Sequence, residues 1–373
     1  MATLLVVVLA GCDATSASPH GEGDTASIDL SDAKLLDDPK AYEGPTHAGL
    51  AEASIDPIAD HPAQALPVTV TDAQGTKVKV TDTSRILALD LYGTLSQTVF
   101  NLGLGDYVVG RDISTQFEEA RDLPLVTENG HELVAEKILE LNPSLIITDS
   151  TLGPWDVILQ MRDAGIPVVV TDSTRSMDNL ASLTEEVAAA LGVPEEGTEL
   201  GERIQAEADA KIAEIAAIAP QNLTDKLRMV FLYVRGQSGI YYMFGEGSGA
   251  DSLITALGGY DVAGEIDWSG MKPVTDEGII SAQPDLILMM TKGLESVDGV
   301  DGLLDRLPAL QQTPAGQKRR IVDMSDTAIL SYGPRTAEVL NALAVAIYAP
   351  DSAIADARTD DVEVDLEPGE AAK

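Results

Sequence analysis

The stretch EKILELNPSLII, residues 136–147, has a counterpart in EGIISAQPDLIL, residues 277–288. Both begin with an acid, continue through the end of a helical pattern to a residue followed by Pro, and finish in an apolar strand. The spacing between the two stretches stays constant from their first residue to their last. This internal repeat predicts two lobes of similar construction.

Around these stretches, apolar runs alternate with helical patterns from about residue 85 onward. The expected strands are 86–90, 107–111, 145–148, 168–171, 228–234, 241–244, 286–290 and 321–324. The expected helices are 94–104, 132–141, 155–164, 179–191, one beginning after 248, and 334–347. Continuous apolar strands between helices are typical of a parallel sheet covered on both faces.

The stretch 195–219 carries no strand signal, and its composition favours one long helix. We therefore predict an α/β protein with two Rossmann-like lobes, each built on a parallel central sheet. A single long helix joins them, and a ligand cleft lies between them. The expected organisation is a signal peptide (1–12), a disordered tether and lead-in (13–83), an N-terminal lobe (84–194), the connecting helix (195–220), a C-terminal lobe (221–350) and an acidic disordered tail (351–373).

Composition excludes several functions. The chain has 373 residues, with 61 acids against 24 bases and a formal net charge of −37. Such a surface repels phosphate backbones, which argues against nucleic-acid binding. Cys12 is the only cysteine, so neither an intramolecular disulfide nor a cysteine-based zinc or iron–sulfur site is expected.

The N-terminus carries a processing signal. Residues 4–10 form an apolar run too short to span a bilayer, and they lead into Leu9-Ala10-Gly11-Cys12, which resembles a bacterial lipobox. Cleavage before Cys12 and acylation of its thiol would anchor the chain on the extracytoplasmic face of the cell membrane without crossing it. No Lys or Arg precedes the apolar run, a departure that places the true translation start upstream.

Histidine is scarce, with His20, His47 and His61 in the predicted tether and only His131 in the predicted body. His131 stands at the expected start of a helix, on the sheet edge where open α/β lobes bind ligands. A neutral imidazole there would serve as a metal ligand. The alternative is a solvated residue at a helix start. No H-E-x-x-H, P-loop or G-x-S-x-G motif occurs.

The second candidate group ends the first strand of the C-terminal lobe. Tyr233 and Arg235 are two residues apart and so face the same side of the strand. A guanidinium beside a phenol favours the phenolate, a hard anionic ligand suited to ferric iron. The alternative is a strand-end Tyr beside an Arg that pairs with some acid. Tyr242 and Met243 follow on the next strand, where alternation leaves open which of them faces the cleft.

The lipobox, the two lobes on one long helix and the segment from Tyr233 to Gly239 resemble the haem-binding lipoproteins of bacterial haem ABC importers, the HmuT-like group. The resemblance covers about residues 84–350. It implies a helical-backbone periplasmic-binding-protein fold with no catalytic activity and ferric haem b as cargo. It also implies that His131 and Tyr233 clamp the iron from both faces and that Arg235 hydrogen-bonds the tyrosine. Tyr242 and Met243 would then support the haem.

The same resemblance implies partners. Binding proteins of this fold dock through one glutamate per lobe onto arginines of a dimeric permease, and the repeat places those glutamates at Glu136 and Glu277. The expected partners are haem, an ABC permease dimer and upstream haem receptors, with the binding protein itself a monomer. A ferric siderophore or cobalamin carrier of the same fold is the main alternative. A surface-anchored metal-dependent hydrolase is a remote one, because a single histidine in the body supplies too few ligands.

Overall fold

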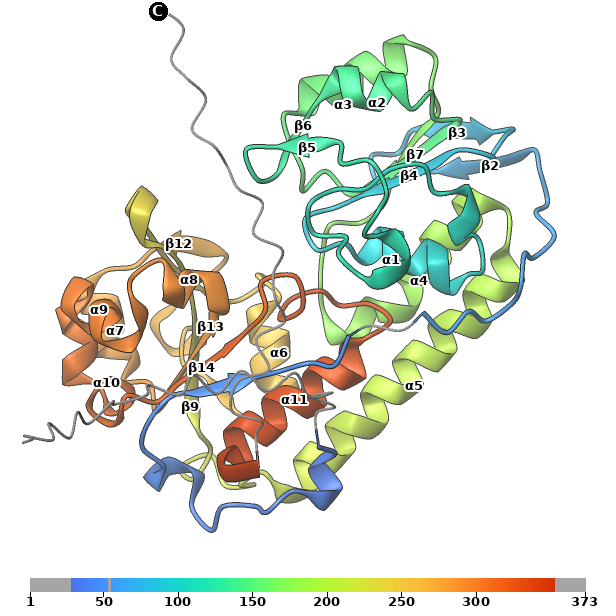
Figure 1. Cartoon of the computed structure of the whole chain (residues 1–373). Coiled ribbons are helices and arrows are strands. Elements are labelled where there is room, and N and C mark those ends of the chain that lie inside the picture. The colour runs from blue at the N-terminus through green and yellow to red at the C-terminus, as the bar shows by residue number, and fades with distance from the viewer. Residues whose placement is uncertain (1–27, 53–54, 353–373) are drawn as a thin grey trace, which may run out of the picture.

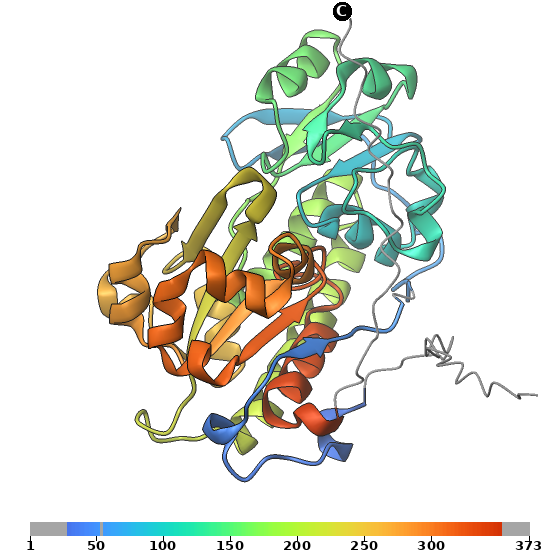
Figure 2. The same cartoon turned by 60° about the vertical axis from the view of Figure 1, so that its left-hand side comes forward.

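The computed structural model describes residues 28–52 and 55–352. Two α/β lobes lie side by side and are joined by the long helix α5, Pro194–Ile218, which runs along one side of both (Figure 1). Figure 2, turned about the vertical axis, shows the N-terminal lobe above the C-terminal lobe, with α5 running along both. The predicted two-lobed α/β architecture is confirmed.

The N-terminal lobe is built on three parallel strands in the order β4 (Ile86–Leu89), β7 (Leu145–Thr148) and β8 (Val168–Val170). All three are buried along their length, because helices cover both faces of the sheet. One face packs against α1 (Thr94–Asn101) and α4 (Leu180–Leu191). The other packs against α2 (Ala135–Glu140) and α3 (Trp155–Asp163). The hairpin of β2 (Val68–Thr71) and β3 (Lys77–Val80) adjoins β8 through the bond from Ala73 N–H to the Val170 carbonyl, 2.8 Å.

The C-terminal lobe contains a larger sheet in the order β1-β14-β13-β9-β10-β12, with β11 beside β9. Its strands are β1 (Thr46–Ala48), β9 (Arg228–Arg235), β10 (Ile240–Phe244), β11 (Tyr260–Asp261), β12 (Met271–Pro273), β13 (Leu286–Met290) and β14 (Ile321–Met324). The helices α6 (Ala250–Ala256) and α11 (Thr336–Tyr348) cover one face. The other face is covered by α7 (Asp276–Ala282), α8 (Thr291–Glu295), α9 (Gly299–Arg306) and α10 (Pro314–Lys318).

This second sheet is mixed rather than wholly parallel as predicted. β10 runs antiparallel to both β9 and β12. Only residues 236–239 separate β9 from β10, and a connection that short permits a hairpin but not a parallel crossover. The hairpin extends the end of β9 toward the facing lobe.

The connecting helix agrees closely with its predicted range and begins with Pro194 in its first turn. Gly197 and Gly201 lie where α5 crosses α4. A Cβ at Gly201 would stand 3.0 Å from the Ala181 carbonyl oxygen, and one at Gly197 would stand 2.2 Å from the Ala188 Cβ. These glycines therefore allow two helix backbones to approach closely, and they do not interrupt α5.

The prediction of a disordered tether over 13–83 is wrong for the described residues of that range. β1 adds a parallel edge strand to β14, and His47, opposite Asp323, lies 2.8 Å from it between Nδ1 and Oδ2. His61 is also part of the ordered body, so His131 is not its only histidine. Three residues show too little side-chain periodicity for a strand to be predicted from them. Backbone pairing with a distant strand stabilises β1 instead.

The described chain starts and finishes on the same lobe. Lys34 N–H donates to the Ser352 hydroxyl at 3.1 Å, and Leu36 N–H donates to the Tyr348 carbonyl at 2.8 Å. No helix among residues 28–52 and 55–352 is long and apolar enough to cross a membrane. The predicted lipobox, including Cys12, and the acidic tail beyond residue 352 lie outside the described residues.

Candidate functional site

His131 lies in the turn of a small hairpin between β5 (Thr127–Glu128) and β6 (Glu132–Leu133). The expected helix over 132–141 is therefore wrong at its start, since α2 begins only at Ala135. Asn129 and Gly130, which precede the histidine, both adopt positive φ, 46° and 86°. Asn-Gly is a strong hairpin signal, and here this local turn chemistry prevailed over the helical pattern.

The hairpin is fixed to its own lobe and presents His131 to the other. Leu133 N–H donates to the Gly153 carbonyl at 2.6 Å, which ties β6 to the loop that follows β7. The His131 side chain is exposed to solvent. Partial desolvation lowers its pKa, and the positive charges of Arg235 and Lys292 lower it further. Both cations belong to the C-terminal lobe, and the lowered pKa favours a neutral imidazole at neutral pH.

Tyr233 and Arg235 occupy the end of β9 on the face that looks toward the N-terminal lobe. The Arg235 guanidinium lies over the Tyr233 ring, 4.5 Å from its centroid. Phe244 stacks against the same ring with a centroid separation of 6.0 Å. A cation over an aromatic face is attracted by the ring quadrupole. The expected hydrogen bond from Arg235 to the tyrosine is replaced by this ring contact.

The hydrogen bonds of Arg235 go elsewhere. Its Nη2 donates to Asp326 Oδ1 at 2.6 Å, and its Nη1 donates to the Val234 carbonyl at 2.9 Å. Asp326 follows β14 and also accepts the Lys292 backbone N–H at 3.0 Å. Burial raises the pKa of Asp326, while Arg235 opposes that shift. Asp326 was not predicted as a site residue. Its position just beyond a strand is the sequence signal that could have identified it.

Tyr242 and Met243 separate onto opposite faces of the sheet. Tyr242 pairs in register with Tyr233 and so shares its face. Met243 pairs with Leu232 and is fully buried in the core beneath α7 and α9. Met243 is therefore wrong as a residue of the cleft, because side chains alternate along a strand and only one of two neighbours reaches each face.

Glu136 and Glu277 take equivalent places. Each is the second residue of its helix, α2 or α7, and each is exposed. The two helices lie on the outer sides of the two lobes (Figure 1). The internal repeat in the sequence thus corresponds to a structural repeat, while the docking role of the two glutamates stays a prediction.

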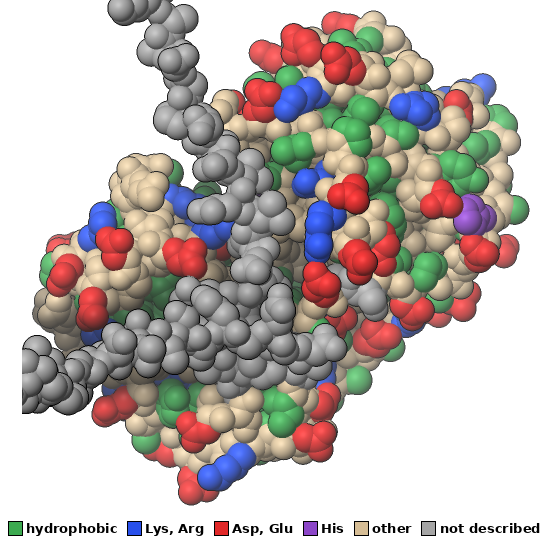
Figure 3. Space-filling model, viewed as in Figure 1, with side chains coloured by type: hydrophobic (Ala, Val, Ile, Leu, Met, Phe, Trp, Pro, Cys, Tyr) green, Lys and Arg blue, Asp and Glu red, His purple; other side chains and the backbone are tan. Residues whose placement is uncertain are grey.

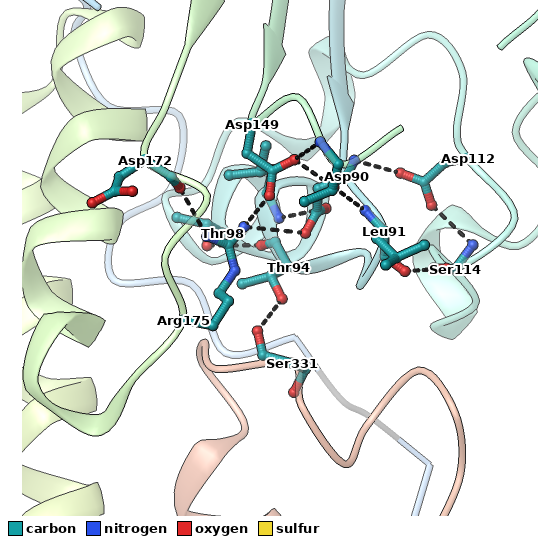
Figure 4. Close-up of polar contacts among 12 residues, drawn as sticks. Asp90, Leu91, Thr94, Thr98, Asp112, Ser114, Asp149, Asp172, Arg175 and Ser331 are labelled. Carbon is teal, nitrogen blue, oxygen red and sulfur yellow. Dashed lines mark hydrogen bonds and ion pairs between the residues drawn. The ribbon is translucent and has the colours of Figure 1, made fainter. Parts of the chain in front are cut away.

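A cluster of buried charged residues lies at the strand ends of the N-terminal lobe (Figure 4). Arg175 forms an ion pair with Asp149 and stands 3.6 Å from Asp90 Oδ2. Asp112 accepts the Asp90 backbone N–H at 3.1 Å, and Leu95 N–H donates to Asp90 Oδ1 at 3.1 Å. The three acids follow β4, the 107–111 segment and β7, so parallel strand ends bring them together.

One arginine does not neutralise three buried carboxylates. Burial first, and then the charges of Asp149 and Asp112, raise the pKa of Asp90 to about 8. Burial also raises the pKa of Asp112 to about 6. Asp90 is consequently protonated at neutral pH. The Thr94 hydroxyl nearby donates to the Ser331 carbonyl, so this cluster adjoins a direct contact between the lobes.

A cavity of about 450 Å³ lies between the two lobes, beside α5. Its walls come from residues 174–178 of one lobe, segments within 247–256 of the other, and Ile212 of the helix. Neither His131 nor Tyr233 lines it. Lys and Arg side chains lie on the margins of both lobes that face each other, on an otherwise acidic surface (Figure 3).

Two α/β lobes joined by one long helix, with His131 on one lobe and the Tyr233–Arg235 pair on the other, are typical of a substrate-binding protein. The chain belongs to the periplasmic binding protein family, whose model matches residues 91–328. Members of this family serve ABC transporters by binding rather than by catalysis, so the hydrolase alternative falls away.

Among solved structures, a heme-binding protein HmuT is 38% identical, with a TM-score of 0.78, and the match covers 83% of this chain and 99% of that one. Variants of that protein at an Arg, a His and a Tyr have also been solved, and its Arg follows its Tyr by two positions. An ABC transporter substrate-binding lipoprotein of Bacillus subtilis is 25% identical over 80% of this chain and 90% of its own length. A cobalamin-binding protein of Halobacterium salinarum is 24% identical over 77% of this chain and 75% of its own.

Proposed function

We propose that this protein captures ferric haem b outside the cytoplasm and delivers it to an ABC permease for iron acquisition. The observation that supports the proposal is that His131 of the N-terminal lobe lies within range of the charge of Arg235, which covers the Tyr233 ring on the C-terminal lobe. The heme-binding relative at 38% identity, with its Tyr and Arg at the same spacing, supports the same ligand.

The two facing side chains suit haem iron in different ways. The lowered pKa of His131 keeps its ring nitrogen available to a metal. Tyr233 offers a phenolic oxygen, a hard ligand that favours the ferric state. Iron held on both faces has no open position for oxygen, which suits a carrier. Tyr242, next to Tyr233 on the same face, would contact the porphyrin.

Charge in the cleft fits a carboxylated ligand. Arg235 and Lys292 raise the positive potential at His131 in a chain whose net charge is −37. Haem carries two propionates, and cations on the wall would orient the disc with these groups near them. Upstream haem receptors would be the suppliers of the ligand.

A cobalamin or ferric siderophore carrier is the second candidate, and the cobalamin-binding relative favours it. Bulky chelates suit sites lined by tryptophan, but Trp268 donates to the Met243 carbonyl on the far side of the sheet. Trp155 packs with the core that holds α2 and α3. These placements favour haem.

The test is an absorption titration of the purified protein with haemin, with cyanocobalamin as the competing ligand. Wild type should give a six-coordinate ferric spectrum with a tyrosinate charge-transfer band. Tyr233→Phe should remove that band, His131→Ala should leave a tyrosine-only species, and Arg235→Ala should act more mildly. His61→Ala, at an exposed histidine, is the control. Unchanged spectra in both ligand variants, or binding of cobalamin alone, would reject the proposal.

Anchoring and docking complete the proposal. Acylation at Cys12 would hold the protein on the outer face of the membrane. Glu136 and Glu277, exposed at equivalent helix positions, would pair with arginines of the permease dimer. Such pairs mainly fix the orientation of the cleft over the channel. Replacing both glutamates by alanine should slow haem uptake into vesicles that contain the permease and leave haem binding intact.

A further inference from the structure

The helices α2 and α7 share more than their glutamates. Two residues after Glu136, Ile138 is fully buried, and one residue later Leu139 is 46% exposed. Two residues after Glu277, Ile279 is buried, and Ile280 is 37% exposed. Each helix thus shows the same order of exposed acid, buried isoleucine and exposed aliphatic residue.

This agreement is not expected of ordinary surface residues. Exposed leucines scattered singly are normal in folded proteins. Here, however, the aliphatic residue stands three positions after the glutamate in both lobes, and residues at that spacing are neighbours on one helix face. The buried isoleucine between them packs into the lobe and fixes which way that face points.

The charged residues near the two helices leave Glu136 and Glu277 available to a partner. On α2, Lys137 pairs with Glu128 at 2.9 Å and is thereby held on its own lobe. On α7, Asp276 precedes Glu277 and adds to the negative charge. Each helix therefore offers a partner a carboxylate beside an apolar side chain, and the complementary surface is a cation beside an apolar depression.

We propose that Leu139 and Ile280 are the apolar halves of two equivalent docking contacts, each completed by the adjacent glutamate. The occupant is a permease dimer, because two copies of one motif on two similar lobes match a partner that presents two equivalent surfaces. The inference rests on the docking proposed above. The aliphatic side chains would exclude water from the ion pairs, as residues around an interface hot spot do.

The experiment measures binding of the haem-loaded protein to its permease in nanodiscs, with haem titration and melting temperature recorded for every variant. Leu139→Ser with Ile280→Ser should weaken permease binding about tenfold or more without changing haem affinity. Leu223→Ser is the matched control, since that side chain is 61% exposed and lies on the connection between α5 and β9. It should bind like wild type.

Salt separates the two halves of the contact. Glu136→Ala with Glu277→Ala should flatten the salt dependence of permease binding, whereas the Leu139→Ser and Ile280→Ser pair should preserve it. Weaker binding in the glutamate variant with wild-type binding in the serine variant would overturn this inference and leave docking intact. Wild-type binding in both would overturn docking as well.

Discussion

Asp326 holds Arg235 over the ring of Tyr233. The carboxylate accepts the guanidinium at 2.6 Å, and the guanidinium carbon then lies 4.5 Å from the ring centroid. The two residues come from loops and strands 91 positions apart in the chain. An acid beyond the end of β14 therefore positions a guanidinium at the end of β9.

The first prediction concerns this acid. Asp326→Asn removes the charge partner of Arg235 and keeps the side-chain shape, so the guanidinium should lose its fixed place beside the tyrosine. We expect haem to dissociate about three- to tenfold faster, equivalent to about 0.7–1.4 kcal/mol, with a shifted tyrosinate band. Stopped-flow transfer of haem to apomyoglobin measures the rate. Asp298→Asn, at an exposed pair with Arg306, should have no effect.

The second prediction concerns pH. Asp90, with its pKa raised to about 8, keeps its proton in the folded state after the unfolded chain has lost it. Stability should therefore fall as pH rises from about 4 to about 8, by up to about 1.4 kcal/mol per unit for this group. Asp90→Asn should flatten the curve of unfolding free energy against pH, measured in urea. Asp122→Asn, at an exposed acid, should leave it unchanged, and a parallel curve for Asp90→Asn would contradict the assignment.

The third prediction concerns the seat of the connecting helix. Gly201→Val would place side-chain carbons against the Ala181 backbone, already 3.0 Å from an added Cβ. We expect a loss of about 1–3 kcal/mol in unfolding free energy, as for other overpacked cores. Gly264→Val meets no atom within 4 Å and serves as the control. Equal stability of the two variants would contradict this prediction, because it would show that α5 shifts to accommodate the added side chain.

The fourth prediction concerns the anchor. Cys12→Ala should move the protein from the membrane fraction to the supernatant and leave its haem spectrum unaltered, because the acylated thiol and the cleft are separate features. Detergent phase separation of cell extracts reports the partitioning. Continued recovery of Cys12→Ala in the detergent phase would show that another feature holds the protein to the membrane.

The sequence predicted the parts of the fold that local patterns determine. Continuous apolar runs marked the buried strands, and the repeat at 136–147 and 277–288 correctly paired α2 with α7. β1 was not predicted because its stability comes from backbone pairing with β14, which is far along the chain. His131 was placed at a helix start because a helical pattern follows it, while Asn129 and Gly130 make a hairpin.

The shared face of Tyr233 and Arg235 was predictable from the sequence, and the residues around this pair were less so. Tyr233 and Arg235 share a face because they are two positions apart, and this holds for any strand. The prediction for Met243 is wrong because alternation along a strand shows which residues share a face. It does not show which of the two faces borders the cleft. The contacts of Asp326 and Asp90 could not be predicted, because they join strand ends that are distant in the sequence and meet only in the folded protein.

Residues 34 and 352 meet on the C-terminal lobe, so both ends of the described chain leave from one place. A pull applied through either end enters β1 or α11, and both pack on that same lobe. The N-terminal lobe is joined covalently to this lobe by the segment that follows β1 and by α5, and side-chain contacts such as Thr94 with Ser331 add to these connections. In a molecule held by the proposed anchor at Cys12, Tyr233 would lie on the anchored lobe and the hairpin that carries His131 on the other lobe.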